Sequence, residues 1–179
     1  MAKAKVLESR YAFADPWLRL RSDTVLLPNG RLLSPCTIFE YPDWVDVIAL
    51  TGERNVVLVD QYRHAVGQLR TEFPAGAVDE AEVPLAAIKR ELLEETGYLA
   101  SKIRPLCSFF TSPGVMDEKI YAFVATGLEK QKQQLEEGEE IEVVEVTLET
   151  AMDMIRMGQI QDAKTIVALM MYERFFQKA

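Results

Sequence analysis

The sequence predicts an α/β protein: one domain with helices on both sides of a mixed β-sheet, preceded by an antiparallel β appendage. Short apolar runs typical of strands alternate with segments of helical period along most of the chain. An Asn-Gly turn lies between two apolar runs near the N-terminus. Neither a repeat nor a linker rich in proline or serine interrupts the 179 residues.

The strands are expected where apolar and β-branched residues run between turn residues. Residues 24–33 predict two short strands around Asn29-Gly30, a dipeptide that favours tight hairpin turns. Further strands are expected at residues 45–50, 55–60, 106–110, 120–125 and 141–146.

The first helix is predicted to begin at Pro84, because the missing N–H of proline does no harm in a first helical turn. Gly97 is expected to end it, since glycine adopts the left-handed conformation that closes many helices. Leu85, Ile88 and Leu92 recur at helical spacing and form its expected apolar stripe.

Two further helices are expected near the C-terminus. Gly158 should end the first of them, and Asp162 should cap the start of the second. Their apolar faces share helical spacing. They consist of Ala151, Met154 and Ile155 in the first helix and of Ile166, Leu169 and Met170 in the second.

The domain organisation follows from this order of elements. We expect residues 1–43 to form a partly separate β region and residues 44–179 to form the main domain. The β region is rich in apolar residues for an appendage, and exposed apolar patches of this kind usually mark interfaces. They include Val25, Leu26, Leu27, Leu32, Leu33, Ile38 and Phe39.

Composition excludes several classes of function. The net charge of −8 argues against a nucleic-acid polymer as partner, because phosphate backbones are bound by clustered lysine and arginine. The chain has no apolar run long enough to span a membrane and begins without a secretory signal, so we expect a cytoplasmic protein.

Cys36 and Cys107 provide neither a disulfide framework nor a zinc site. The single histidine, His64, has no evident nucleophile to serve and is either structural or a substrate contact.

Three carboxylates of the first helix share one face. Glu91, Glu94 and Glu95 stand at i, i+3 and i+4, where their repulsion is unfavourable unless a positive charge lies nearby. Oxygen donors on a rigid element suit Mg²⁺, which takes few carboxylates and leaves room for substrate phosphates. Gly76, which precedes the helix, allows the backbone to come close, and the planar side chain of Arg90 can orient a neighbouring carboxylate.

Residues 76–98 match the pattern G-x5-E-x7-R-E-U-x-E-E-x-G-U, where U is a bulky apolar residue. Tyr98 is a less typical occupant of the last position. The fixed positions are filled by Gly76, Glu82, Arg90, Glu91, Glu94, Glu95 and Gly97. This segment resembles the Nudix box of hydrolases that act on nucleoside diphosphates linked to another group, which implies a Nudix-type α/β/α sandwich.

Motifs outside the box resemble the ADP-ribose pyrophosphatase branch of this family. Residues 59–63, 72–76, 111–118 and 158–165 carry the likeness, and Pro113 lies where that branch has a proline, 15 residues past Tyr98. Enzymes that cleave GDP-mannose and other sugar nucleotides share much of these motifs. The resemblance therefore implies hydrolysis of a nucleoside diphosphate sugar, with ADP-ribose as the best single substrate.

The resemblance also implies roles for individual residues. Glu91, Glu94 and Glu95 would hold two or three Mg²⁺ ions, for which Mn²⁺ is a possible substitute, and the carbonyl of Ala75 would complete the metal shell. In the acid-rich stretch from 131 to 142, Glu139 would be a further metal ligand and Glu137 the general base. The alternative is that these loop carboxylates are simply solvated.

Four residues are candidate substrate contacts. Arg63 is expected to bind a phosphate or the terminal ribose, with an ordinary ion pair as the alternative. Trp44 would stack on the base or else be buried. Glu72 and Glu118 lie in the branch motifs and would line the sugar pocket. For the motif residues Ser112-Pro113-Gly114, the alternative is a simple rigid turn.

Three functions are weighed. The favoured one is Mg²⁺-dependent hydrolysis of a nucleotide sugar by a homodimer, the assembly that this branch typically forms through its N-terminal β region. A regulator that binds nucleotide sugars without cleaving them is disfavoured because every box glutamate is intact. An enzyme that hydrolyses nucleoside triphosphates is disfavoured by the Pro113 motif and the N-terminal extension.

Overall fold

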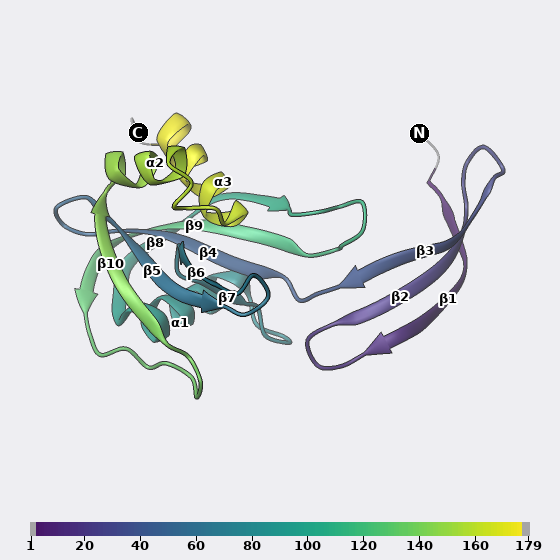
Figure 1. Cartoon of the computed structure of the whole chain (residues 1–179), viewed down its shortest axis with the longest axis horizontal. Coiled ribbons are helices and arrows are strands. Elements are labelled where there is room, and N and C mark those ends of the chain that lie inside the picture. Colours follow the sequence, from purple (N-terminus) through teal and green to yellow (C-terminus); the bar gives the residue numbers. More distant parts are fainter. Residues whose placement is uncertain (1–2, 177–179) are drawn as a thin grey trace. The chain divides into compact units, whose positions relative to one another are not determined.

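Two units make up the chain in the computed structural model, which describes residues 3–176. The first unit comprises Met1–Pro42 and Phe110–Lys119, and the second comprises Asp43–Phe109 and Ile120–Ala179. Each unit has its own sheet (Figure 1).

The first unit is built on an antiparallel sheet of β1 (Lys5–Ala14), β2 (Arg19–Leu26) and β3 (Leu32–Glu40) in that order. The turn between β2 and β3 has Gly30 at a φ of 81°, which confirms the predicted Asn-Gly hairpin. Strand β1 was not expected, because no turn residues precede it and its ten residues, all exposed, show no sustained alternation of apolar and polar side chains. Residues 110–119 join this unit through a hydrogen bond of 2.8 Å from the Phe39 N–H to the Val115 carbonyl.

The second unit contains a mixed sheet with the strand order β10-β5-β4-β9-β8. Strand β4 runs parallel to β9, whereas the pairs β4 with β5 and β5 with β10 are antiparallel. Strand β6 pairs with β5, and the short β7 pairs with β4. The bounds are β4 Trp44–Leu50, β5 Asn55–Arg63, β6 Gln68–Glu72, β7 Ala75–Ala77, β8 Tyr98–Phe110, β9 Lys119–Lys130 and β10 Ile141–Thr147.

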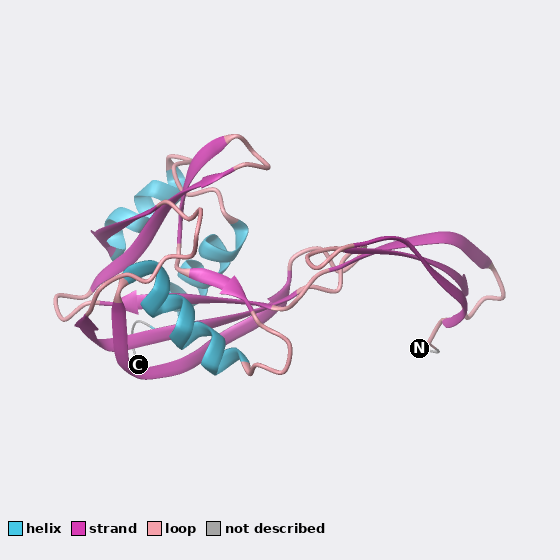
Figure 2. Cartoon of the chain, turned by 90° about the horizontal axis from the view of Figure 1, so that it is seen from below, coloured by secondary structure: helices cyan, strands magenta, loops and turns pink. Residues whose placement is uncertain are grey.

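Helices cover both faces of this sheet (Figures 1 and 2). One apolar cluster joins helix α1 (Pro84–Thr96) to Val45, Val47 and other strand residues. The other cluster joins α2 (Leu148–Arg156) and α3 (Ala163–Met171) to Ile48 and its neighbours. Because successive side chains of β4 point to opposite faces, a single strand contributes to both clusters. The predicted α/β/α sandwich with a mixed sheet is confirmed.

The helix ends agree with the sequence analysis. Pro84 is in the first turn of α1, and Gly97 closes the helix with a φ of 70°. Asp162 caps α3 by accepting a hydrogen bond of 2.8 Å from the Thr165 N–H. Helix α2 ends at Arg156, and Gly158 follows with a φ of 71°. A short π-helical turn, Tyr172–Phe176, extends α3.

Some details of the prediction are wrong. Leu85 and Met170 are exposed, at 42% and 46%, because the buried faces of α1 and α3 are centred instead on Ala87 to Leu92 and on Ala168 and Leu169. Strands β8 and β9 are longer than expected, since they continue as polar, partly exposed ribbons. Strands β6 and β7 were missed because neither has a clear apolar alternation.

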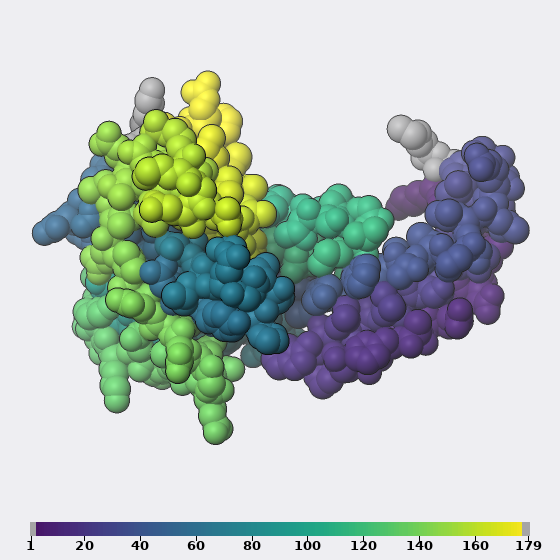
Figure 3. Space-filling model, in the orientation of Figure 1, coloured from purple at the N-terminus to yellow at the C-terminus, as the bar shows by residue number. Residues whose placement is uncertain are grey.

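The acidic loop, defined here as residues 131–140, joins β9 to β10. Figure 3 shows it at the surface, in light green, and most of its residues are exposed. None of the helices within residues 3–176 combines the length and the apolar composition needed to cross a membrane.

Candidate active site

Gly76 and Glu91 lie against each other at the start of the site. Strand β7 places Gly76 beside Val45 of the central strand, and α1 crosses directly over β7. A Cβ atom added to Gly76 would lie 2.0 Å from the carboxylate of Glu91, a distance that no real contact allows. The glycine of the motif is therefore needed so that the Glu91 side chain can approach the backbone of β7.

Glu95 is held by the same strand. Its side chain is 4% exposed, and its carboxylate accepts a hydrogen bond of 3.0 Å from the Ala75 N–H. Ala75 was expected to contribute its carbonyl oxygen to a metal shell, and the structure brings this residue directly to the Glu95 carboxylate. The carboxylates of Glu91 and Glu95 thus both pack on a backbone segment of three residues.

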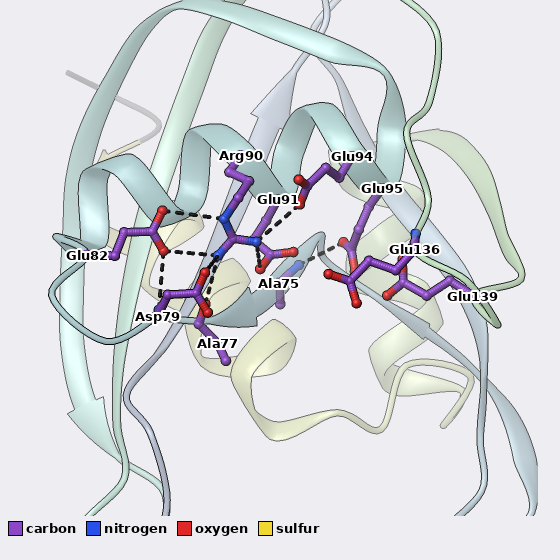
Figure 4. A network of polar contacts seen from close by, with 10 residues as sticks. All are labelled: Ala75, Ala77, Asp79, Glu82, Arg90, Glu91, Glu94, Glu95, Glu136 and Glu139. Atoms are coloured by element: carbon purple, nitrogen blue, oxygen red, sulfur yellow. Dashed lines mark hydrogen bonds and ion pairs between the residues drawn. The ribbon is translucent and has the colours of Figure 1, made fainter. Parts of the chain in front are cut away.

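Arg90 fixes the remaining box residues from the middle of a network (Figure 4). Its guanidinium donates to Glu91 at 2.6 Å and to Glu94 at 3.1 Å on one side. On the other side it donates to Glu82 at 3.0 Å and to the Ala77 carbonyl at 3.1 Å. Glu82, for which the sequence analysis had assigned no role, is the residue that positions Arg90. Arg90 in turn orients Glu91, as expected.

The pKa values of the network reflect its burial. Hydrogen bonding to Glu82 raises the pKa of Arg90 above its ordinary value, although burial acts in the opposite direction. Burial raises the pKa of Glu91 to about 7 even though the charge of Arg90 lowers it. Burial likewise raises the pKa of Glu95 to about 8 against the hydrogen bond from Ala75. The surroundings of partly buried Glu91 and buried Glu95 therefore favour the neutral carboxyl, and ionising both groups would require additional positive charge nearby.

The acidic loop contributes Glu139 to this cluster. The negative charge of Glu139 raises the pKa of both Glu91 and Glu95, and Figure 4 shows its side chain on the Glu95 side of the network. A turn at Gly138, with a φ of 95°, lets the Glu136 N–H donate to the Glu139 carboxylate at 3.0 Å. Glu137, in the same turn, is exposed.

The donor set fits a divalent cation. Within residues 3–176 no three carboxylate, imidazole or thiol groups already stand in the arrangement of a metal site. The chemistry of the donors nevertheless suits a hard cation, since Glu91, Glu95 and Glu139 offer only oxygen atoms and lie within electrostatic range of one another. A cation bound there would supply positive charge that favours the ionised forms of Glu91 and Glu95.

Arg63 and Glu72 form a bidentate ion pair, with hydrogen bonds of 3.1 and 2.8 Å across strands β5 and β6. The ion pair that was considered as the alternative for Arg63 is thus present. Burial lowers the pKa of Arg63, but the hydrogen bond and charge of Glu72 together with the charges of Glu95 and Asp162 outweigh this and raise it. Arg63 therefore lies within electrostatic range of one box carboxylate, that of Glu95.

The other candidate substrate contacts are more scattered. Trp44 is half-buried, and the ammonium group of Lys164 lies 6.0 Å from its ring centroid. Glu118 belongs to the first unit, where it accepts a hydrogen bond of 2.6 Å from Thr111. His64 is exposed, and its ring is near that of Tyr62.

Two residues near the site were missed by the sequence analysis. Asp46 is completely buried in β4, and among the described residues 3–176 neither of its carboxylate oxygens has a hydrogen-bond partner. Burial raises its pKa well above the ordinary value, although the charge of Lys164 lowers it. The detectable signal was a carboxylate inside the apolar run W-V-D-V-I-A-L. The second missed residue is Gln133, whose side-chain amide donates to the Glu95 carbonyl. Nothing in its sequence neighbourhood indicated this contact.

Comparisons with known proteins agree with this geometry. A family model described as the NUDIX domain matches residues 40–169, and a model of the nucleoside diphosphate sugar hydrolase N-terminal domain matches residues 5–35. A crystal structure described as an ADP compounds hydrolase superimposes with a TM-score of 0.87 at 20% identity, covering 99% of this chain and 96% of that chain. At this identity the likeness concerns the fold.

Three relatives span most of the chain. A methanol dehydrogenase activator of Bacillus methanolicus is 39% identical, and an ADP-ribose pyrophosphatase of Bacillus subtilis (strain 168) is 37% identical. Each comparison covers 92% of this chain and 90% of the relative. A GDP-mannose pyrophosphatase of Escherichia coli (strain K12) is 37% identical, with 66% of each chain covered. The intact box, the sandwich fold and these matches together show that the chain belongs to the Nudix hydrolase family.

Proposed function

We propose that this Nudix hydrolase cleaves the diphosphate bond of nucleoside diphosphate sugars in a reaction that depends on Mg²⁺. ADP-ribose is the best single substrate, and its products are AMP and ribose 5-phosphate. The observation that carries the proposal is the packing of partly buried Glu91 and buried Glu95 on Gly76 and Ala75, which places two carboxyl groups where additional positive charge would favour their ionised forms. The names of the relatives from Bacillus subtilis and Escherichia coli support this class of substrate.

The residues of the chain have distinct tasks in this reaction. Glu91, Glu94, Glu95, Glu139 and the Ala75 carbonyl are the proposed metal ligands, with two or three Mg²⁺ ions as the expected complement and Mn²⁺ as a substitute. Bound divalent cations would offset charge on the diphosphate and lower the pKa of an attacking water. Arg90 holds Glu91 in its orientation through the hydrogen bond of 2.6 Å.

The bond changes follow from the substrate. The oxygen of water forms a bond to one phosphorus while the bond from that phosphorus to the bridging oxygen breaks. A carboxylate of the acidic loop accepts the proton of the water, and Glu137 is the proposed base. Glu137 is exposed, so this role requires the loop turn to bring it toward the diphosphate when substrate binds.

The substrate contacts proposed are Arg63, Trp44, Glu72 and Glu118. Arg63 is favoured because it lies within electrostatic range of Glu95, and binding a phosphate would require it to exchange or share its ion pair with Glu72. GDP-mannose is the second candidate substrate, favoured by the likeness to the GDP-mannose pyrophosphatase.

A substrate panel tests the proposal. Purified protein with Mg²⁺ should release AMP from ADP-ribose, and parallel assays with GDP-mannose and other nucleotide sugars should show slower release of the nucleoside monophosphate. A protein that bound ADP-ribose in calorimetry but hydrolysed none of these compounds would contradict the enzymatic function.

We also propose that the chain forms a cytoplasmic homodimer through its N-terminal β region, residues 1–43. Large apolar side chains of the first unit are solvent-exposed in the single chain, as is typical of interfaces. They are Val6, Leu7, Tyr11, Phe13, Trp17, Leu32, Leu33 and Phe39. Light scattering should give twice the mass of 20.3 kDa, and a monomer mass would reject the dimer.

A further inference from the structure

The proposed metal ligands Glu91, Glu94 and Glu95 stand in the last two turns of helix α1. The C-terminal end of this helix presents backbone carbonyls that have no partner within the helix. Its last turn, all of which the structure describes, contains no basic residue. A helix C-terminus carries partial negative charge, and here three glutamates stand in or near that turn. These carbonyls therefore need hydrogen-bond donors from another part of the chain.

The last residue of β9, Lys130, and the first residues of the acidic loop supply those donors. The Lys130 ammonium donates to the Thr96 carbonyl at 3.0 Å, and the Gln131 N–H donates to the Gly97 carbonyl at 2.6 Å. The Gln134 N–H donates to the Glu94 carbonyl at 3.0 Å. The loop thus begins by covering the end of the helix that bears the metal ligands.

Gln131 and Gln134 donate from the backbone, whereas Gln133, like Lys130, acts through its side chain. The amide nitrogen of Gln133 lies 2.6 Å from the Glu95 carbonyl oxygen and 3.5 Å from the Ile141 carbonyl oxygen. Glu95 is a proposed metal ligand, and Ile141 is the first residue of β10, immediately after the acidic loop. One side chain therefore connects the beginning of the loop, its end and the helix.

Gly97 makes this close packing possible. A Cβ atom at Gly97 would lie 2.6 Å from the Gln131 carbonyl oxygen and 2.9 Å from the Gln133 backbone nitrogen. The last glycine of the box therefore has two roles, since it closes the helix with a positive φ and also leaves space for residues 131–133.

We propose that Gln133 is a positioning residue that holds the two ends of the acidic loop against α1 and thereby keeps Glu139 beside Glu91 and Glu95. Its consequence for catalysis rests on the function proposed above, whereas its effect on the loop does not. Without the side-chain amide, residues 135–140 would keep their sequence and their charges but lose the side-chain contact that joins both ends of the loop to the helix.

The primary test compares Gln133→Ala with Gln134→Ala as a matched control, because Gln134 contributes only its backbone N–H to the helix end. Amide hydrogen exchange over residues 135–140 should become about 10-fold faster in Gln133→Ala and stay unchanged in Gln134→Ala. The Mg²⁺ concentration that gives half of the maximal thermal stabilisation should rise by about 10-fold in Gln133→Ala only, as for other residues that support metal ligands. The kcat for ADP-ribose should fall by a similar factor, with little change in KM.

Gln133→Met provides a second variant, which keeps the side-chain volume but removes the donor. Equal hydrogen exchange in residues 135–140 for the wild type and both Gln133 variants would overturn the inference, whatever the activity. A wild type that hydrolyses no nucleotide sugar would reject the proposed function, and the exchange comparison would still decide the role of Gln133. A lower kcat accompanied by unchanged exchange and unchanged Mg²⁺ dependence would also overturn it.

Discussion

At the scale of single residues, the site depends on a close approach between carboxylates and backbone. Glu91 occupies the space where a side chain on residue 76 would be, and Glu95 accepts the Ala75 N–H. Each contact serves a carboxylate that is costly to bury without a positive charge. A substitution that removes the charge of such a carboxylate is therefore expected to lower activity without lowering stability.

Changing Glu95 to Gln should reduce kcat for ADP-ribose by at least about 100-fold, because it removes the charge of a proposed metal ligand. The amide oxygen can still accept the Ala75 N–H, and the neutral amide resembles the protonated carboxyl that burial favours, so the thermal midpoint of the metal-free protein should not fall. Steady-state kinetics and a melting curve check this prediction. Glu80→Gln, at an exposed position of the same segment, is the control. Unchanged activity in Glu95→Gln would refute the ligand role.

Changing Gly76 to Ala should displace the Glu91 carboxylate, because the new Cβ would lie 2.0 Å from it. We expect the Mg²⁺ concentration for half-maximal activity to rise by about 10-fold or more. Gly52→Ala is a matched control, since nothing lies within 4 Å of a Cβ there. Equal Mg²⁺ dependence in the two variants would show that Glu91 can be moved without loss.

At the scale of elements, the ends of helices α1 and α3 are capped in different ways, and both ends are hydrogen-bonded to distant segments of the second unit. Helix α1 begins without a side-chain cap and is closed by Gly97 and the start of the acidic loop. Helix α3 instead has a strong cap, because Asp162 accepts from both the N–H and the hydroxyl of Thr165. The Thr165 hydroxyl also accepts the Phe73 N–H at 2.9 Å, which ties α3 to the segment between β6 and β7.

Asp162→Ala should lower the free energy of unfolding by about 1 to 2 kcal/mol at neutral pH, the usual cost of losing a helix cap. Asp162→Asn keeps an oxygen acceptor and should cost less.

Burial raises the pKa of Asp162, but the charge of Lys164 and the hydrogen bonds outweigh it and leave the pKa below 3.8. The charged cap therefore stabilises the fold above that pH, and its contribution is lost as pH falls through the lower folded-state pKa. Urea denaturation of the three proteins measures these differences, and equal midpoints would contradict the role of the cap.

At the scale of the whole molecule, stability and metal binding should be linked through Glu91, which is partly buried, and Glu95, which is buried. The pKa values of Glu91 and Glu95 are raised from 4.5 to about 7 and about 8 by burial. Their neutral forms are thus favoured in the folded, metal-free protein, while the unfolded chain ionises at lower pH. The resulting stabilisation is complete below pH 4.5 and is lost as pH rises toward 8.

We therefore expect the thermal midpoint of the chelator-treated protein to be lower at about pH 8 than at about pH 6, with Mg²⁺ raising it more at the higher pH. Melting curves with and without Mg²⁺ at both values provide the measurement. The double variant Glu91→Gln, Glu95→Gln should show a much weaker dependence on pH and on Mg²⁺. A midpoint that rises steadily with pH in the metal-free wild type would contradict this linkage.

The sequence by itself determined the features that depend on neighbouring residues. The spacing of Glu91, Glu94 and Glu95 places them on one helix face, and Pro84, Gly97 and Asp162 mark helix ends through their backbone geometry. The apolar runs of β4 and β5 likewise predicted the buried strands and hence the sandwich. These features follow from helical and strand periods, which hardly depend on distant parts of the chain.

Only the tertiary structure decided which distant residues meet. Gln133 reaches Glu95 across 38 positions, and Glu139 comes near the box carboxylates through the same loop. The pairing of Arg63 with Glu72 follows from the register of β5 and β6. Strand β1 is exposed along its whole length, so its sequence has no apolar pattern that would predict a strand. Contacts of this kind depend on strand order and loop paths, which are set by the packing of the whole unit and leave no periodic signal in the sequence.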